Sequence, residues 1–289
     1  MDWLERCVTD ADRFLRTQWR RGPALLRPAD PPTEVLGLAD LDDLLDSGTL
    51  RVPYAGLFTM AGAVPEAAYC PPRVVAGRYL EGWLDAERVR ALIRDEQATL
   101  QLRYVNHWYP PVRELTAGLA RELDRLVEAF LFYSQPGRFG AVHRDDGDIL
   151  VLQLSGAKHW KVYGGPTDGH WQPVREDDPG EVLLDTVVRP GEVLYVPNGY
   201  AHTAQATADG PSLHLTIVLR EAGADHLRAQ LRSFLAEGLA LPARPLGDED
   251  LTATAAALLA HVTDRLDAAD APSLVHSARL HAYSSRPTA

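Results

Sequence analysis

The sequence is poor in cysteine and has no long apolar run. Its two cysteines, Cys7 and Cys70, form no CxxC pair, which excludes a disulfide framework and a CxxC metal or redox motif. The first residues, Met-Asp-Trp-Leu-Glu-Arg, lack the apolar stretch of a secretory signal. No apolar run approaches the ~20 residues that a membrane-spanning helix needs. We therefore expect a cytoplasmic protein with reduced thiols and no membrane association.

Positive charge is also in deficit. The chain has 29 Lys and Arg against 40 Asp and Glu, a formal net charge of −11. Nucleic-acid binding is not expected, because neutralising phosphates requires clustered Lys and Arg. The excess of acid is compatible with a basic partner, and the alternative is that the charge only keeps the protein soluble. With 46% hydrophobic and 24% charged residues, the composition is that of a globular protein and excludes disordered and fibrous classes.

The first 129 residues have mainly helical patterns. Four segments carry apolar residues at helical spacing: 2–20, 41–45, 85–100 and Pro111 to about Ala129. Asp40 is expected to cap the second helix, and Pro111 lies in the first turn of the fourth. Prolines break the stretch 50–80, which is predicted to be irregular or strand-like. We expect this N-terminal region, 1–129, to pack on a β core and to contribute strands to it.

The pattern changes at residue 130. Short β-type runs alternate with turn residues over Phe130–Ser134, Ile149–Leu154, Ala157–Tyr163, Val182–Val188, Val193–Val196 and Leu213–Leu219. Several short strands at regular spacing predict an antiparallel barrel or sandwich over 130–220. Helical patterns return in the segment 221–289, with helices expected over Asp225–Glu237 and Asp250–Leu266.

The strongest candidates for a metal site are His143 and Asp145. In a strand, residues two apart share a face, so these side chains would project together. His202 follows a turn, a strand and a second turn, and a barrel could bring it to the other two. Two histidines and one carboxylate with open positions form the ligand set of non-haem Fe(II) oxygenases. Since an isolated His-x-Asp pair occurs by chance in many proteins, a surface turn is the alternative.

Lys158 is a candidate for binding a small carboxylate. Alternation places Lys158 on the same face as Trp160 and Val162. If that face is the barrel interior, the ammonium is buried, which is costly unless it is paired. No acid lies on this run, so a bound carboxylate is the expected partner. The alternatives are that Lys158 lies at a solvent-filled opening of the barrel, or that the face with Trp160 points outward.

Polar side chains alternate along the last expected strand of the core. Ser212, His214 and Thr216 share one face, which predicts that this face lines a pocket; a solvent-facing edge is the alternative. Asn106 precedes His107, which would either flank the pocket or lie in a loop, and we count Asn106 among the pocket candidates. The other histidines, including His159 and His170, are expected to be exposed or structural.

The stretch HRDDGDILVLQLSGAKHWKVY, together with GEVLYVPNGYAH and SLHLTI further along, resembles the JmjC-type cupins of the ribosomal-oxygenase group. Members of this group are Fe(II)- and 2-oxoglutarate-dependent hydroxylases. The resemblance is close over 130–220 and extends in layout over the N-terminal half. It implies a fold that is mainly β with α flanks. The core would be a double-stranded β-helix (a jelly-roll cupin of the JmjC type), with N-terminal helices and a C-terminal helical segment.

Carried over residue by residue, the resemblance implies that His143, Asp145 and His202 bind iron and that Lys158 pairs with the distal carboxylate of 2-oxoglutarate. The group often has an Asn on the strand before the His-x-Asp pair, where this chain has Tyr133 and Ser134 as substitutes. The group's final strand often ends in Ser, where this chain has Val218. The 2-oxoglutarate ligands are thus expected to be Lys158, Tyr133, Ser134 and Thr216, and the pocket residues His214, Ser212 and Asn106.

The activity implied is that of a dioxygenase that uses Fe(II), 2-oxoglutarate and O2 to hydroxylate an amino-acid side chain in a protein or peptide. The same chemistry on a small molecule or a peptide natural product is the alternative. A zinc or nickel cupin is a different class, and Asp145 weighs against it because such sites commonly use His-x-His with Glu. A non-catalytic cupin scaffold is a further class. We expect residues 221–289 to mediate homodimerisation through leucine-rich helix faces.

Overall fold

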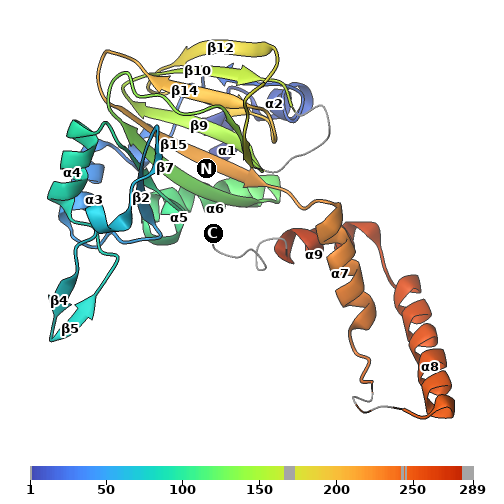
Figure 1. The fold of residues 1–289 in the computed structure, drawn as a ribbon. Helices are drawn as coiled ribbons and strands as arrows, with labels where there is room; N and C mark the ends of the chain where they lie inside the picture. Colours follow the sequence, from blue (N-terminus) through green and yellow to red (C-terminus); the bar gives the residue numbers. More distant parts are fainter. Residues whose placement is uncertain (1, 166–172, 242–243, 245, 282–289) are drawn as a thin grey trace. The chain divides into compact units, whose positions relative to one another are not determined.

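The computed structural model describes all residues except 1, 166–172, 242–243, 245 and 282–289. The chain divides into two compact units, Met1–Arg220 and Glu221–Ala289. Figure 1 shows the helices and strands of the described residues. The candidate site lies in the first unit.

Two antiparallel sheets form the centre of the first unit. The larger sheet has the order β1 (Ala24–Leu26), β13 (Val193–Val196), β9 (Asp148–Ser155), β15 (Ser212–Arg220), β7 (Leu126–Ser134), β6 (Thr99–Leu102), β2 (Ala55–Thr59) and β3 (Gly62–Ala63). The smaller sheet has the order β11 (Val174–Arg175), β8 (His143–Arg144), β14 (His202–Ala206), β10 (Lys158–Tyr163) and β12 (Val182–Val188). A separate hairpin joins β4 (Arg73–Val75) to β5 (Arg78–Leu80).

The two sheets face each other. Figure 1 shows β12, β10 and β14 lying over β9, β15 and β7. The apolar side chains between the sheets are Ile149, Val151, Trp160, Val162, Val188, Leu194, Val196 and Val218. The predicted antiparallel sandwich with helical flanks is therefore confirmed. His202 opens β14, as the sequence predicted. The strand expected to contain His143 and Asp145 is β8, which ends at Arg144, so that Asp145 lies just beyond it. Sequence patterns missed β11, which spans only two residues.

Strand β15 is central to the larger sheet and is buried along its whole length. Leu215 and Ile217 point into the core between the sheet and the N-terminal helices, whereas Val218 points between the two sheets. The alternative of a solvent-facing edge for this strand was wrong.

Helices of the N-terminal part pack on the outer face of the larger sheet. They are α1 (Trp3–Cys7), α2 (Ala11–Thr17), α3 (Leu38–Asp46), α4 (Ala86–Asp95), α5 (Val105–Trp108) and α6 (Pro110–Leu123), with single 3-10 turns at η1 (Thr33–Val35) and η2 (Glu66–Ala68). Their buried faces share one core with the sheet, which includes Phe14, Leu41, Val89 and Leu119.

Three of the predicted helix boundaries were wrong. The helix expected over 2–20 is two helices, because Val8 is extended and the Asp10 carboxylate caps a new start by accepting from the Arg13 N–H at 2.8 Å. The helix expected to reach Leu100 ends at Asp95, and its last predicted residues belong to β6. The helix expected to reach Ala129 ends at Leu123, because Asp124 takes a left-handed conformation (φ 51°) and β7 follows.

The cap predicted for α3 was also wrong in detail. Gly37, not Asp40, is the N-cap residue. Asp40 lies one turn later and accepts a hydrogen bond from the Gly37 N–H at 2.7 Å. The carboxylate still satisfies a free N–H at the start of the helix, but it does so from inside the first turn.

The second unit is helical. It contains α7 (Ala224–Ala236), α8 (Asp248–Asp267) and α9 (Ala271–His281), and α7 contacts both of the others. The first two match the predicted helices, and α9 was not predicted. Among the described residues of the whole chain, no helix is both long enough and apolar enough to cross a membrane.

Candidate active site

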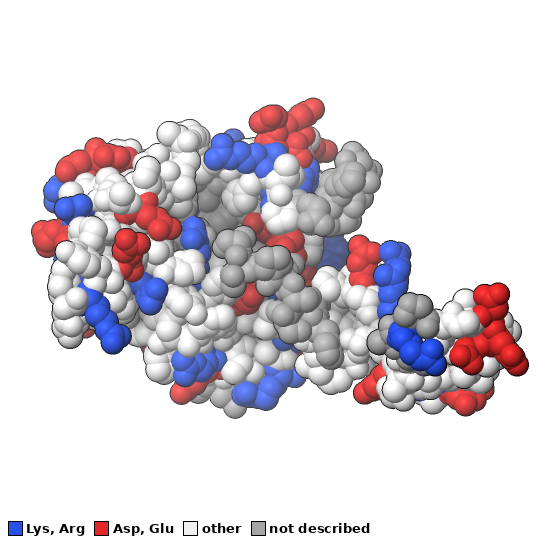
Figure 2. Space-filling model, turned by 60° about the horizontal axis from the view of Figure 1, so that its bottom comes forward, with Lys and Arg blue, Asp and Glu red and all other residues white. Residues whose placement is uncertain are grey.

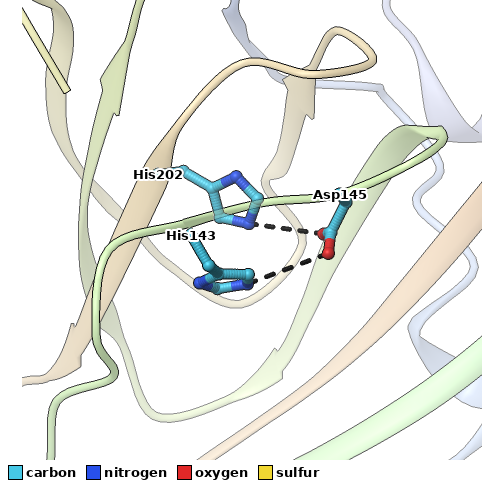
Figure 3. Close-up of side chains that lie close together, drawn as sticks. All are labelled: His143, Asp145 and His202. Carbon is cyan, nitrogen blue, oxygen red and sulfur yellow. Dashed lines mark ion pairs between the residues drawn. The ribbon is translucent and has the colours of Figure 1, made fainter. Parts of the chain in front are cut away.

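His143, Asp145 and His202 lie together at one end of the smaller sheet. His143 on β8 and His202 on β14 are register partners on neighbouring strands, and Asp145 follows β8. The ligand atoms of the three side chains lie within 4.8 Å of one another. The Asp145 carboxylate oxygens are 3.9 Å from His143 Nε2 and 3.4 Å from His202 Nε2 (Figure 3). The structure thus brings together the three residues that the sequence singled out.

Both imidazoles are held with Nε2 toward Asp145. His143 Nδ1 lies 2.9 Å from the Ala141 carbonyl oxygen, and His202 Nδ1 lies 3.0 Å from that of Tyr200. Because a carbonyl can only accept, each Nδ1 carries a proton, and Nε2 is the ring nitrogen that binds a metal once it has lost its own proton. This outer hydrogen bond is the arrangement usual for histidines that bind metals. The donor set therefore fits a divalent metal ion.

Charges in the triad also favour metal binding. Burial raises the pKa of Asp145, but the hydrogen bond from His202 and the charge of the nearby histidines outweigh it and bring the pKa to about 2. Burial and the neighbouring His202 lower the pKa of His143. Burial opposes the charged form of His202 as well, but Asp145 raises its pKa overall. At neutral pH the carboxylate is ionised and His143 is neutral, which are the forms that bind a metal.

Arg144, between the two ligands of the His-x-Asp pair, points away from the triad. Its buried guanidinium donates from Nη1 to the carbonyl oxygens of Gly164 (2.9 Å) and Gly199 (2.7 Å), and from Nε to Glu176 (2.8 Å). These bonds fasten the turn before His202 to β8. Sequence reasoning missed this residue, although alternation along the strand already placed it opposite His143.

A cavity of about 410 Å³ lies beside the triad, within the range of ligand pockets. Its wall is formed by both sheets. Among its lining residues are Phe58, Thr99, Phe132, Ser134, Arg138, His143, Asp145, Lys158, Trp160, Arg175, His202, His214 and Thr216.

Lys158 points into this cavity, as the alternation along β10 predicted. Lys158, Trp160 and Val162 are buried, and the residues between them are half-buried. Lys158 Nζ donates to Ser134 Oγ at 3.1 Å. Burial, together with the like charge of Arg138, lowers the pKa of Lys158 to about 7. A carboxylate bound here would reverse that shift by pairing with the ammonium.

His214 and Thr216 also line the cavity. The His214 ring stacks on Phe132 with centroids 5.0 Å apart and an interplanar angle of 7°, and Trp160 meets its edge. Burial, and to a lesser degree the Lys158 charge, lowers the pKa of His214 well below its ordinary value. His214 is therefore neutral at physiological pH.

Three predicted site residues lie outside the cavity wall. Tyr133 points to the opposite face of β7 from Ser134, because neighbours on a strand alternate, and it lies against α3. The Ser212 hydroxyl accepts a hydrogen bond from Gln153 Nε2 at 2.8 Å, and a register shift after Leu213 separates it from the row of His214.

Asn106 lies on α5 and has a backbone partner. Its Oδ1 accepts a hydrogen bond from the Ala129 N–H at 3.0 Å. The side chain therefore joins a short helix to β7 and does not flank the cavity. Of the other histidines, His159 pairs with Asp185 away from the triad, and His170 lies outside the described residues.

Residues 113–227 match the JmjC domain family. The chain is 29% identical over 220 residues to ribosomal oxygenase 1 of Gallus gallus, a match that covers 71% of this chain and 34% of the relative. It is 23% identical over 230 residues to the bifunctional lysine-specific demethylase and histidyl-hydroxylase NO66 of Culex quinquefasciatus, covering 74% and 33%. The chain thus spans about a third of the length of these curated relatives.

The fold is similar to that of YcfD, a ribosomal oxygenase from Escherichia coli solved in complex with cobalt and 2-oxoglutarate. The TM-score is 0.52 at 18% identity, with 86% of this chain and 65% of the other covered. Together with the match to the JmjC domain, this likeness confirms the predicted fold class, a β-rich JmjC-type cupin core with helical flanks.

Proposed function

We propose, for a chain that contains a JmjC domain and is homologous to ribosomal oxygenase 1, that it is an Fe(II)- and 2-oxoglutarate-dependent dioxygenase. The observation that carries this proposal is the cavity shared by the His143–Asp145–His202 cluster and the buried ammonium of Lys158. One end offers two imidazoles and a carboxylate, the ligand set of Fe(II) oxygenases. The other offers a cation for a carboxylate.

In this function, His143, Asp145 and His202 hold Fe(II). When bound, the metal supplies the oxidising chemistry in which 2-oxoglutarate and O2 become succinate and CO2 and one oxygen atom enters a C–H bond of the substrate. Lys158 and Ser134 bind the distal carboxylate of 2-oxoglutarate. Thr216 and neutral His214 line the space between these ends, and the surrounding apolar side chains exclude bulk water and fix the position of the target carbon.

The proposed substrate is an amino-acid side chain in a protein or peptide, in line with the names of the relatives, ribosomal oxygenase and histidyl-hydroxylase. The net charge of −11 favours a basic substrate surface. Acidic and basic groups of the described residues are interspersed on the face drawn in Figure 2, without a continuous basic stripe. A short basic segment is thus favoured over nucleic acid as the partner.

We further propose a cytoplasmic homodimer. The two buried cysteines fit a reducing compartment. Helix α8 exposes Leu258, Leu259 and Leu266, apolar side chains of the kind that a subunit interface covers. The proposed dimer interface lies in residues 221–289.

The test of the proposed function is anaerobic binding of 2-oxoglutarate to the purified chain, with and without Fe(II). We expect binding that requires the metal and is lost in His143→Ala. The matched control is His159→Ala, which removes an imidazole outside the cluster and is expected to bind as the wild type does. Absence of metal-dependent binding in the wild type would overturn the proposal, and metal analysis of the protein would then separate another metallo-cupin from a scaffold.

A further inference from the structure

Arg138 is a second buried cation in the cavity that contains Lys158. It is 7% exposed and forms part of the cavity wall. Its Nε has no hydrogen-bond partner among the described residues, and its Nη2 reaches the Phe58 carbonyl oxygen only at 3.5 Å, beyond the usual range for such bonds. A buried guanidinium with so little compensation is unfavourable unless a ligand completes its shell.

The backbone register places Arg138 and Lys158 in one row across the smaller sheet. Phe139 forms a bridge with Gln205, and the Ala206 N–H donates to the Arg138 carbonyl at 2.8 Å. Arg138 therefore lies opposite Ala206, which on its other side is the register partner of Lys158. Residues in such a row point to the same face of the sheet. The two long side chains leave the sheet about 10 Å apart, two strand spacings.

Their charged ends converge on one place in the opposite sheet. Lys158 donates to Ser134, whose hydroxyl lies 3.2 Å from Thr99 Oγ1. Thr99 is the register partner of Phe58, the residue whose carbonyl faces Arg138. The Lys158 ammonium therefore ends beside Ser134 on β7 and the Arg138 guanidinium beside Phe58 on β2. Strand β6, which carries Thr99, lies between these two strands.

This end of the cavity lacks an acid. Among the described lining residues, Asp145 is the sole carboxylate, and it is engaged by His143 and His202. Arg138 and Lys158 carry like charges in this space, and after burial the Arg138 charge is the second cause that lowers the pKa of Lys158. An anion between them would remove this repulsion and fill the donor shell of Arg138.

We propose that Arg138 is a specificity-determining residue that binds, together with Lys158, the distal carboxylate of the 2-oxo acid. This rests on the proposed function. A guanidinium can hold a carboxylate through two parallel hydrogen bonds, so Arg138 would select 2-oxo acids with a second carboxylate over those without one. It would also keep a positive charge in the site when Lys158 is neutral.

The experiment compares two probes on the Fe(II)-loaded protein under anaerobic conditions. 2-Oxoglutarate has the distal carboxylate, whereas 2-oxobutanoate keeps the 2-oxo acid end without it. We expect Arg138→Gln to weaken 2-oxoglutarate binding by about tenfold or more, the usual scale for one charge-assisted hydrogen bond, and to leave 2-oxobutanoate binding unchanged. Arg138→Lys, which keeps the charge but not the planar fork, should give an intermediate affinity.

Arg175→Gln is the matched control, because it removes an exposed cation from the wall of the same cavity. It should change 2-oxoglutarate binding much less than Arg138→Gln does. Equal weakening of both probes by Arg138→Gln, equal effects of the two Gln variants, or no effect of Arg138→Gln would each overturn the role of Arg138 while leaving the proposed function intact. If the wild type binds neither probe with Fe(II), the proposed function itself fails, and this inference fails with it.

Discussion

His143 and His202 face each other across the β8–β14 pair, with imidazole centroids 4.4 Å apart. Register alone puts the two rings on one side of the sheet, and Asp145 completes the cluster from the turn that follows β8. The carbonyls of Ala141 and Tyr200 lie two residues before the respective histidines and turn both rings the same way. The site is thus organised by backbone pairing before any ligand is present.

Asp145→Asn is expected to weaken metal binding strongly. The substitution keeps the shape of the side chain but removes the negative charge, and only the ionised form contributes that charge to the metal. We expect Co(II) affinity to fall by more than about a hundredfold, because Asp145 is a direct ligand and the loss of a mere hydrogen-bond partner of a ligand already costs up to that much. Titration under anaerobic conditions measures it. Asp185→Asn, on β12 away from the triad, is the control, and equal affinities in the two variants would contradict the assignment of Asp145.

Lys158→Ala is expected to weaken 2-oxoglutarate binding by roughly ten- to a hundredfold, because it removes a charge-assisted hydrogen bond to the distal carboxylate. Metal affinity should not change, since Lys158 contacts Ser134 and not the triad. Lys161→Ala on the partly exposed face of the same strand is the control. Calorimetry of both ligands decides the matter, and an unchanged 2-oxoglutarate affinity would remove Lys158 from the site.

The affinity for 2-oxoglutarate should fall as the pH rises above neutrality. In the free protein the pKa of Lys158 is lowered to about 7; Arg138 and neutral His214 face its ammonium in the cavity, and Ser134 is its hydrogen-bond partner. Below pH 7 the ammonium is already charged and affinity is flat. Above it, binding must take up a proton, so the affinity declines by up to about tenfold per pH unit.

Calorimetric titrations between pH 6 and 9 would measure this decline. Lys158→Arg stays charged over the whole range and should give a flat profile. A wild-type affinity that is constant or rises between pH 7 and 9 would show that protonation of Lys158 does not control binding.

Spacing and alternation in the sequence predicted the central part of the site. The inward face of Lys158 follows from the period-two pattern of its strand, and His202 follows from its position after a turn, a strand and a second turn. Asp145 lies beside His143 as predicted, although it does so from the turn after β8 and not from within the strand. The ends of helices were harder to predict from the sequence. Leu126 and Val127 continue the apolar spacing of α6, but the left-handed turn at Asp124 ends that helix first, and tertiary pairing makes them part of β7.

The sequence alone could not predict the positions of residues whose roles depend on pairing between distant segments. Arg138 lies outside the named strands, and it is directed into the cavity by the bridge of its neighbour Phe139 to Gln205 and by the hydrogen bond from the Ala206 N–H to its own carbonyl. Tyr133 and Ser134 were both expected at the 2-oxoglutarate site, although neighbours on one strand cannot share a face. Asn106 attracted attention as a polar residue near aromatic ones, yet a backbone N–H of β7 uses its side chain.

Gly156→Ala should destabilise the first unit. Gly156 turns the chain from β9 into β10 with φ 61°, and an added Cβ would lie 2.2 Å from the Pro211 carbonyl oxygen. The left-handed conformation alone costs about 1–2 kcal/mol for alanine, and the backbone clash adds to it. Gly180→Ala is matched to it, because Gly180 has φ 78° with open space around it. Thermal unfolding should therefore show a clearly larger loss for Gly156→Ala, and equal losses would mean that the turn relaxes freely.

Removal of residues 221–289 should convert a dimer into a monomer. Leucines on α7 and α8 form the proposed interface, namely Leu227, Leu231, Leu235, Leu258, Leu259 and Leu266, and Leu259 is 69% exposed in the single chain. The remaining part, Met1–Arg220, is a compact unit of its own, and Arg220 keeps its ion pair with Glu128 at 2.7 Å. Sedimentation of the full chain and the truncated chain measures their masses. A full chain that sediments as a monomer, or a truncated one that stays dimeric, would contradict the placement, because the exposed leucines would then be covered by something other than a second copy.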